Sequence, residues 1–172
     1  MNDYAVQLIQ KYRKEGVLID TNLLLLYVIG TYDPKGVRRS TKTLSFPPNT
    51  FDLVDRVINQ FDKVITTPYI LAEVSNWLAQ FPSSDKNKLH PELFDRFAKL
   101  IKGFVEIPET STGIANHSAF CFLGLAGTSI VSLGNKYLVL TTDGRLMAYL
   151  QKMVLMLSIL TTCNKTAVTS YN

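Results

Sequence analysis

The stretch Val17–Gly30, VLIDTNLLLLYVIG, is the feature that most restricts how this chain can fold. Its first three residues are apolar and follow Gly16, which is typical of a short buried strand. The run that begins at Asn22 is apolar on all sides, as expected of a helix at the centre of a fold. Asp20 lies between the two segments, at the carboxyl end of the strand. In open α/β sheets this edge is where ligands bind.

Short apolar segments alternate with segments of helical periodicity along the chain. Strands are expected around Leu18 and at Val64–Ile65, Phe104–Ile107, Tyr137–Leu140 and Val154–Leu160. Helices are expected at Tyr4–Lys14, from Asn22, and at Phe51–Gln60, Tyr69–Gln80, Leu89–Lys102, Ser118–Leu133 and from Asp143 to about Lys152. This alternation predicts a three-layer α/β/α sandwich with a central parallel sheet of four to five strands. One domain is expected over residues 1–172, with its core at about 16–160.

Residues 31–50 interrupt the pattern with prolines and a glycine, and we expect a long irregular loop there. The loop contains the basic residues Lys35, Arg38, Arg39 and Lys42. Two interpretations are open: a solvated basic loop, or an arm that grips phosphate groups. The formal net charge of +4 permits a polyanionic partner without establishing one.

The sequence predicts a cytoplasmic protein with no membrane association. The residues before Gly16 have charges throughout and no apolar signal region. The apolar stretch that follows is interrupted by Asp20 and Asn22 and is too short to span a bilayer. Two cysteines, Cys121 and Cys163, are too few for a disulfide scaffold, so reduced thiols are expected.

Two further acids are candidates for a shared site with Asp20. Asp143 follows the apolar segment YLVL and opens a helix, so its alternative role is that of a helix cap. Glu73 lies at the border of the apolar stripe formed by Ile70, Val74 and Trp77. Its alternative role is that of a boundary residue with its carboxylate in water. Parallel strands that release acids from one sheet edge would bring Asp20 and Asp143 to the same rim.

Converging carboxylates repel one another unless a cation compensates them. Mg²⁺ or Mn²⁺ suits such a site, because both are hard ions that take oxygen ligands. Such an ion can activate water and neutralise the charge that develops on a phosphate group during displacement. The pattern therefore predicts a divalent-metal site that could act on a phosphate group.

Four segments in order resemble the PIN-domain ribonucleases, in particular the toxin subunits of toxin–antitoxin pairs. They are LIDTNLLL around Asp20, TTPYILAEVSN around Glu73, LGLAGTSIVSL before Tyr137 and LTTDGRL around Asp143. Together they cover the chain from Gly16 to about Leu150. The resemblance implies a metal-dependent endoribonuclease with Asp20, Glu73 and Asp143 as catalytic acids and with the metal held mainly by Asp20 and Asp143.

The resemblance also implies roles for Asn22 and Thr142, which would orient the acids or the substrate. Hydrogen bonds at helix N-termini are the alternative for both residues. Arg38, Arg39 and Arg145 are candidates for contacts with the RNA backbone. The alternative for Arg145 is a solvated residue in the first turn of its helix. A protein antitoxin and a homodimer are further expectations. The apolar helices around Trp77 are a candidate dimer surface, and the alternative is that these residues belong to the core.

Gly127 departs from the family pattern, because family members usually have an acid at this position. Three explanations are open: the protein works with three acids, it is a degenerate nuclease, or an inactivating substitution has replaced the acid. The second explanation leads to the alternative function, a PIN-fold module that binds RNA or protein without cleaving. A dehalogenase-type phosphatase is disfavoured, because it needs an acid where Asn22 stands. A dinucleotide oxidoreductase is disfavoured, because no G-x-G-x-x-G follows the first strand.

Overall fold

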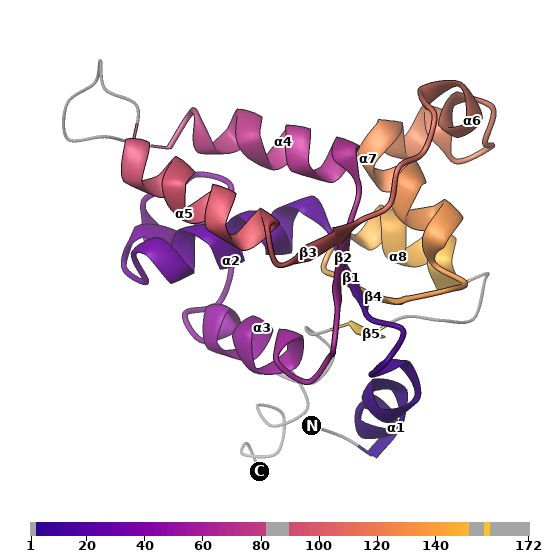
Figure 1. Cartoon of the computed structure of the whole chain (residues 1–172), viewed down its shortest axis with the longest axis horizontal. Helices are drawn as coiled ribbons and strands as arrows, with labels where there is room; N and C mark the ends of the chain where they lie inside the picture. The colour runs from indigo at the N-terminus through magenta and orange to yellow at the C-terminus, as the bar shows by residue number, and fades with distance from the viewer. Residues whose placement is uncertain (1–2, 82–89, 152–156, 159–172) are drawn as a thin grey trace, which may run out of the picture.

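The computed structural model describes residues 3–81, 90–151 and 157–158 of the chain. Short parallel strands form its centre, and helices connect them (Figure 1). The strands are β1 (Val17–Ile19), β2 (Val64–Thr66), β3 (Phe104–Glu106), β4 (Leu138–Thr141) and β5 (Leu157–Ser158). The helices are α1 (Asp3–Tyr12), α2 (Thr21–Tyr32), η1 (Gly36–Arg38), α3 (Thr50–Ile58), α4 (Pro68–Leu78), α5 (Pro91–Ile101), α6 (Ser111–Ala115), α7 (Phe120–Leu133) and α8 (Gly144–Gln151).

Strand β1 occupies the centre of the sheet, whose order is β3-β2-β1-β4-β5. Leu18 lies opposite Ile65 of β2 on one side and Val139 of β4 on the other, and both pairings are parallel. In Figure 1, helices α2 to α5 gather on one side of the strands, and α7 and α8 lie on the other. The predicted three-layer α/β/α sandwich is therefore confirmed, and all carboxyl ends of the strands lie at one edge.

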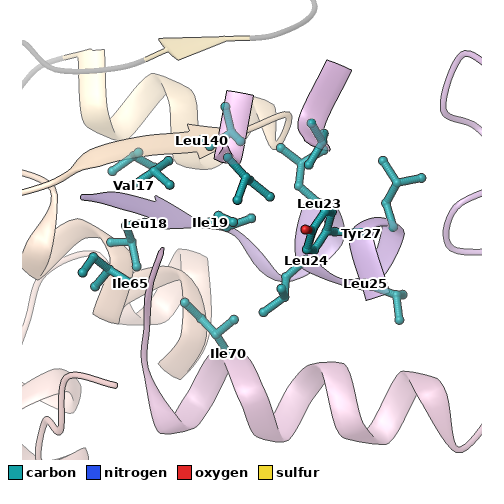
Figure 2. Close-up of a cluster of buried hydrophobic side chains, with 14 of the residues drawn as sticks. Val17, Leu18, Ile19, Leu23, Leu24, Leu25, Tyr27, Ile65, Ile70 and Leu140 are labelled. Atoms are coloured by element: carbon teal, nitrogen blue, oxygen red, sulfur yellow. The ribbon is translucent and has the colours of Figure 1, made fainter. Parts of the chain in front are cut away.

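The core is built around the β1–α2 segment. Figure 2 shows the side chains of β1 between Leu140 of β4 and Ile65 of β2. The four leucines that follow, Leu23 to Leu26, are at most 1% exposed, so α2 is buried on all its faces. Burial on every side explains why this helix has no polar face in the sequence. The strand and helix hold the residue between them, Asp20, at a fixed point of the fold.

The observed elements differ from the expected ones in a few places. Helix α6 lies where the sequence suggested only a polar link. Helix α7 begins two residues later than expected and is kinked at Gly124, whose φ is 64° and ψ is −167°. Helix α1 buries Ala5, Leu8, Ile9 and Tyr12, whereas Val6, which the periodicity places on that face, is exposed. The strand expected at Val154–Leu160 is described only at residues 157–158.

The loop at residues 31–50 is partly held against the body of the protein. Arg39 forms an ion pair with Asp33 and lies 5.6 Å from the ring centroid of Phe81. The Nζ atom of Lys42 lies 3.5 Å from the ring centroid of Trp77 on α4. Two of the basic side chains considered for phosphate binding are therefore engaged in contacts within the chain. In the part of the chain that the structure describes, no helix is both long and apolar enough to cross a bilayer.

Candidate functional site

A pocket of about 250 Å³ is formed by residues that follow the carboxyl ends of β1 and β4, together with α4 and α7. It brings together the three candidate acids, which are far apart in the sequence. The lining residues are Asp20, Thr21, Asn22, Glu73, Phe122, Leu123, Gly127, Ile130, Asp143, Arg145 and Leu146. Asn22 and Gly127, which the family pattern also singled out, share this pocket with the acids, whereas Thr142 is not among the lining residues.

Asp20 is the most constrained of the three acids and is 3% exposed. Its Oδ1 atom accepts a hydrogen bond of 2.8 Å from the amide of Leu23, so Asp20 is the N-cap of α2. Its Oδ2 atom accepts hydrogen bonds from the hydroxyl of Thr141 and, at 3.2 Å, from the amide of Thr142. These partners come from both β1–α2 and β4–α8, so the carboxylate links the two strand ends.

Burial raises the pKa of the Asp20 carboxyl group above its ordinary value of 3.8. The hydrogen bonds from Leu23, Thr141 and Thr142 lower this pKa because they stabilise the charged form, and the nearby negative charge of Asp143 raises it. The net direction is upward. Asp20 is therefore a carboxylate whose negative charge the fold alone does not fully compensate.

Asp143 is only half-buried, and its hydrogen bonds differ from those of Asp20. Its Oδ1 atom accepts hydrogen bonds from the amides of Arg145, at 2.7 Å, and Leu146, at 3.2 Å. These are the bonds of a helix cap, the alternative that the sequence left open. No described residue donates a hydrogen bond to Oδ2. Asp143 thus caps α8 with one oxygen and leaves the other available at the pocket.

Glu73 is the most exposed of the three candidate acids, whereas Asn22 is in the same half-buried range as Asp143. Glu73 is exposed on α4, and its Oε2 atom accepts a hydrogen bond of 2.9 Å from the hydroxyl of Thr21. Asn22 is half-buried in the first turn of α2 and lines the pocket. Glu73 therefore fulfils both interpretations. Its carboxylate is in contact with solvent, as expected of a boundary residue, and it also lies at the pocket with the other acids.

Thr21 and Thr141 are site residues that the sequence analysis missed. The hydroxyl of Thr141, which is fully buried, donates to Asp20 and accepts a hydrogen bond from the amide of Asp143. Thr142, which the family pattern assigns to orienting the acids, contacts Asp20 through its backbone amide. The available signal was the pair of threonines directly before Asp143 at the end of an apolar strand.

Gly127 lies on α7, close to Leu123. A Cβ atom at position 127 would be 2.8 Å from the Cβ of Leu123, which is closer than such atoms approach in proteins. Because the Cβ of Leu123 is fixed to its backbone, an acid at position 127 would require the first turn of α7 to shift. This turn directly precedes the kink at Gly124. The absence of a side chain at position 127 therefore matches the local packing of the helix.

The pocket supplies oxygen ligands of the kind that Mg²⁺ and Mn²⁺ prefer. Among the described residues, however, no group of three His, Cys, Asp or Glu side chains is close enough to form a complete metal site. Asp20 and Asp143 interact electrostatically across the pocket. Mg²⁺ commonly binds through one or two carboxylates and keeps several waters. The residues present thus fit a hydrated ion at this pair better than an ion enclosed by protein ligands.

Comparison of the chain with protein-family models, with curated proteins and with solved structures finds no match.

Proposed function

We propose that this protein is a metal-dependent endoribonuclease of the PIN-domain type. The observation that supports this most strongly is that Asp20, Glu73 and Asp143 line one pocket although they come from distant parts of the chain. The raised pKa of the buried Asp20 also favours a cationic ligand beside it. The motif resemblance supplies the reaction, hydrolysis of RNA phosphodiester bonds.

In this proposal Asp20 and Asp143 hold Mg²⁺ or Mn²⁺. When bound, the ion would supply charge neutralisation at the phosphate and a lower pKa for an attacking water. Thr141 and the amide of Thr142 fix the orientation of the Asp20 carboxylate. Glu73, exposed at the pocket, is available to accept a hydrogen bond from water. The side chain of Arg145, also at the pocket, is available for a backbone phosphate.

The test is cleavage of a mixed RNA population with Mn²⁺, compared with the same reaction in chelator. We expect cleavage that Asp20→Ala or Asp143→Ala lowers about 100-fold or more, because loss of an ion ligand removes several kcal/mol of transition-state stabilisation. The matched control is Asp52→Ala, since Asp52 is an exposed acid in the first turn of α3 and does not line the pocket. Cleavage that persists in chelator, or in both pocket variants, would exclude the proposal.

The alternative function, a PIN-fold module that binds RNA or protein without cleaving it, is favoured by Gly127. The family pattern has an acid there, whereas the packing against Leu123 leaves no space for even a Cβ atom. The local packing of α7 is thus compatible with glycine at this position.

Gly127→Asp separates the two functions, and Gly127→Asn is its matched control because it has the same shape without the charge. If an acid at position 127 completes a nuclease site, Gly127→Asp strengthens Mn²⁺ binding in calorimetry and increases RNA cleavage, whereas Gly127→Asn changes neither. Both variants are expected to melt at a lower temperature than the natural chain because of the contact with Leu123. If neither the natural chain nor Gly127→Asp cleaves RNA with Mn²⁺, the binding module is the better description.

A cytoplasmic location, a protein antitoxin and a homodimer belong to this proposal as expectations of the PIN-toxin resemblance. Trp77 is a less available dimer surface than the sequence suggested, because it packs against the core and is covered by Lys42. Size-exclusion chromatography with light scattering measures the oligomeric state. A dimer that survives Trp77→Ala would direct the search for its interface to other residues.

A further inference from the structure

Phe122 is exposed at the pocket that contains the acids. It is 65% exposed, more than any other large apolar residue in the described part of the chain. It also lines the pocket, where it is the only aromatic residue among the described lining residues. A single exposed apolar side chain is ordinary on a protein surface. Its position beside three carboxylates and Arg145 is the feature that needs an explanation.

The backbone holds Phe122 at this place. Ala119, which precedes it by one helical turn, is fully buried and accepts a hydrogen bond of 3.0 Å from the amide of Phe122. Ser118 accepts a further bond of 3.3 Å from the hydroxyl of Tyr149 on α8. At Gly124 the chain then adopts a positive φ, which a residue with a side chain rarely adopts. The kink separates the first turn of α7, which contains Phe122, from the rest of the helix. The first turn therefore does not continue the face that the rest of α7 buries in the core.

A nucleotide has groups that match the side chains around Phe122. Every base has a flat apolar face that stacks on an aromatic ring, and this contact does not depend on sequence. The phosphate groups need cations, and Arg145 lines the same pocket with no hydrogen bond from its guanidinium group to another described residue. The acids provide the place for the scissile phosphate and its ion in the function proposed above.

We propose that Phe122 is a positioning residue on which a base next to the scissile phosphate stacks, so that the substrate must present an unpaired base at this point. This inference rests on the proposed ribonuclease function. A base within a duplex has both faces covered by its neighbours and cannot stack on a protein ring without leaving the helix. Phe122 would therefore restrict cleavage to positions of an RNA strand where a base is unpaired.

Leu125 provides the matched control. It lies just beyond the kink and is 37% exposed, but it does not line the pocket. If this end of α7 were instead an apolar surface for a protein partner, Phe122 and Leu125 would contribute in the same way. If Phe122 stacks on a base, only Phe122 matters for RNA, and another aromatic residue can replace it.

The experiment measures binding of a fluorescently labelled, unstructured RNA oligonucleotide in chelator by anisotropy, followed by its cleavage with Mn²⁺. We expect Phe122→Ala to weaken binding about 5- to 150-fold, the range of one base–aromatic stack. Phe122→Trp and Leu125→Ala should stay within about twofold of the natural chain, because the first keeps an aromatic face and the second lies outside the pocket. An oligonucleotide with an abasic nucleotide beside the cleaved bond should be bound equally by the natural chain and Phe122→Ala.

The outcomes separate this inference from the proposed function. If the natural chain neither binds nor cleaves RNA, the ribonuclease proposal fails and the role of Phe122 fails with it. If the natural chain cleaves RNA and Phe122→Ala binds it equally well, only the stacking role is wrong. Equal weakening by Phe122→Ala and Leu125→Ala would also overturn it, in favour of an apolar interaction surface. Circular dichroism melting curves check that each variant is folded.

Discussion

The strand ends at β1 and β4 each supply an acid to the same pocket, yet the two acids are held very differently. Asp20 directly follows Ile19, the last residue of β1, and is almost completely buried. Asp143 follows β4 with one residue in between and is half-buried. The carboxylate of Asp20 accepts hydrogen bonds at both oxygens, whereas that of Asp143 has one oxygen without a described donor. Asp20, which follows its strand directly, is thus held at both oxygens. Asp143, which follows its strand one residue later, keeps one oxygen available.

One local pattern, an apolar strand followed by an acid and a helix, therefore serves two purposes in this fold. Asp20 ties the two strand ends together, since its partners Thr141 and Thr142 lie at the end of the neighbouring strand. Among the described residues, Asp143 forms hydrogen bonds only within its own helix and with that same threonine, Thr141. Stability should therefore depend mainly on Asp20, whereas ion binding should depend on both acids.

The largest expected effect is the difference in stability between Asp20→Ala and Asp143→Ala. Asp20→Ala removes the cap of α2 and leaves the buried hydroxyl of Thr141 without its acceptor, so we expect a loss of about 2 kcal/mol in the free energy of unfolding. Asp143→Ala removes only the cap of α8, for a loss of about 1 kcal/mol. Urea denaturation measures both values. Equal losses would show that the two acids are held equally strongly in solution.

A smaller effect is expected in the pH dependence of stability. The folded-state pKa of Asp20 is raised above 3.8. Between pH 3.8 and this raised pKa, the folded protein therefore binds more protons than the unfolded chain. The contribution of Asp20 to the free energy of unfolding is therefore fully present below pH 3.8, and it is lost as the pH rises through the raised pKa. Asp20→Asn lacks this titration and is the reference.

The measurement is the melting temperature of both chains in chelator between pH 3.5 and about 8, a range that spans the titration of a carboxyl group with a raised pKa. The natural chain should lose stability relative to Asp20→Asn as the pH rises, and Mn²⁺ should restore it at the upper end of the range. Parallel curves for the two chains would mean that the hydrogen bonds from Leu23, Thr141 and Thr142 fully offset the effect of burial on the pKa.

Much of the fold was predictable from sequence, because its centre has unusually clear patterns. The segment VLID and the leucines after it specify a buried strand, an acid and a buried helix within a few residues. The alternation of elements then determines a parallel sheet, and a parallel sheet places the ends of its strands at one edge. These rules, together with the motif resemblance, are enough to assign Asp20, Glu73 and Asp143 to one region of the fold.

The contacts within the pocket were not predictable in the same way. The hydrogen bond from Thr141 to Asp20 joins residues 121 positions apart, and it depends on the register between β1 and β4. The exposed Phe122 lies two residues before the kink at Gly124, whereas the sequence predicts a continuous helix through this glycine. Periodicity describes which face of an element is buried. It does not describe where a helix bends or which side chains meet across strands.

The smallest expected effect concerns Glu73, the acid that belongs to neither strand end. It is exposed, and Thr21 at the start of α2 donates a hydrogen bond to it. Thr21→Val keeps the shape of the side chain and removes the donor, so we expect a change in stability below about 1 kcal/mol. If the bond only orients Glu73, RNA cleavage should fall by less than about tenfold, which corresponds to 1.36 kcal/mol.

Glu73→Gln is the matched variant, because it keeps the size of the side chain and the acceptor for Thr21 while it removes the negative charge. If Glu73 acts through its charge, Glu73→Gln should lower kcat more than Thr21→Val does, with little change in KM in either case. A greater loss in Thr21→Val would instead mean that Glu73 works only when it is held in place. The third acid would then resemble the anchored Asp20 more than the available Asp143, and exposure alone would be a poor guide to how firmly a carboxylate in this pocket is fixed.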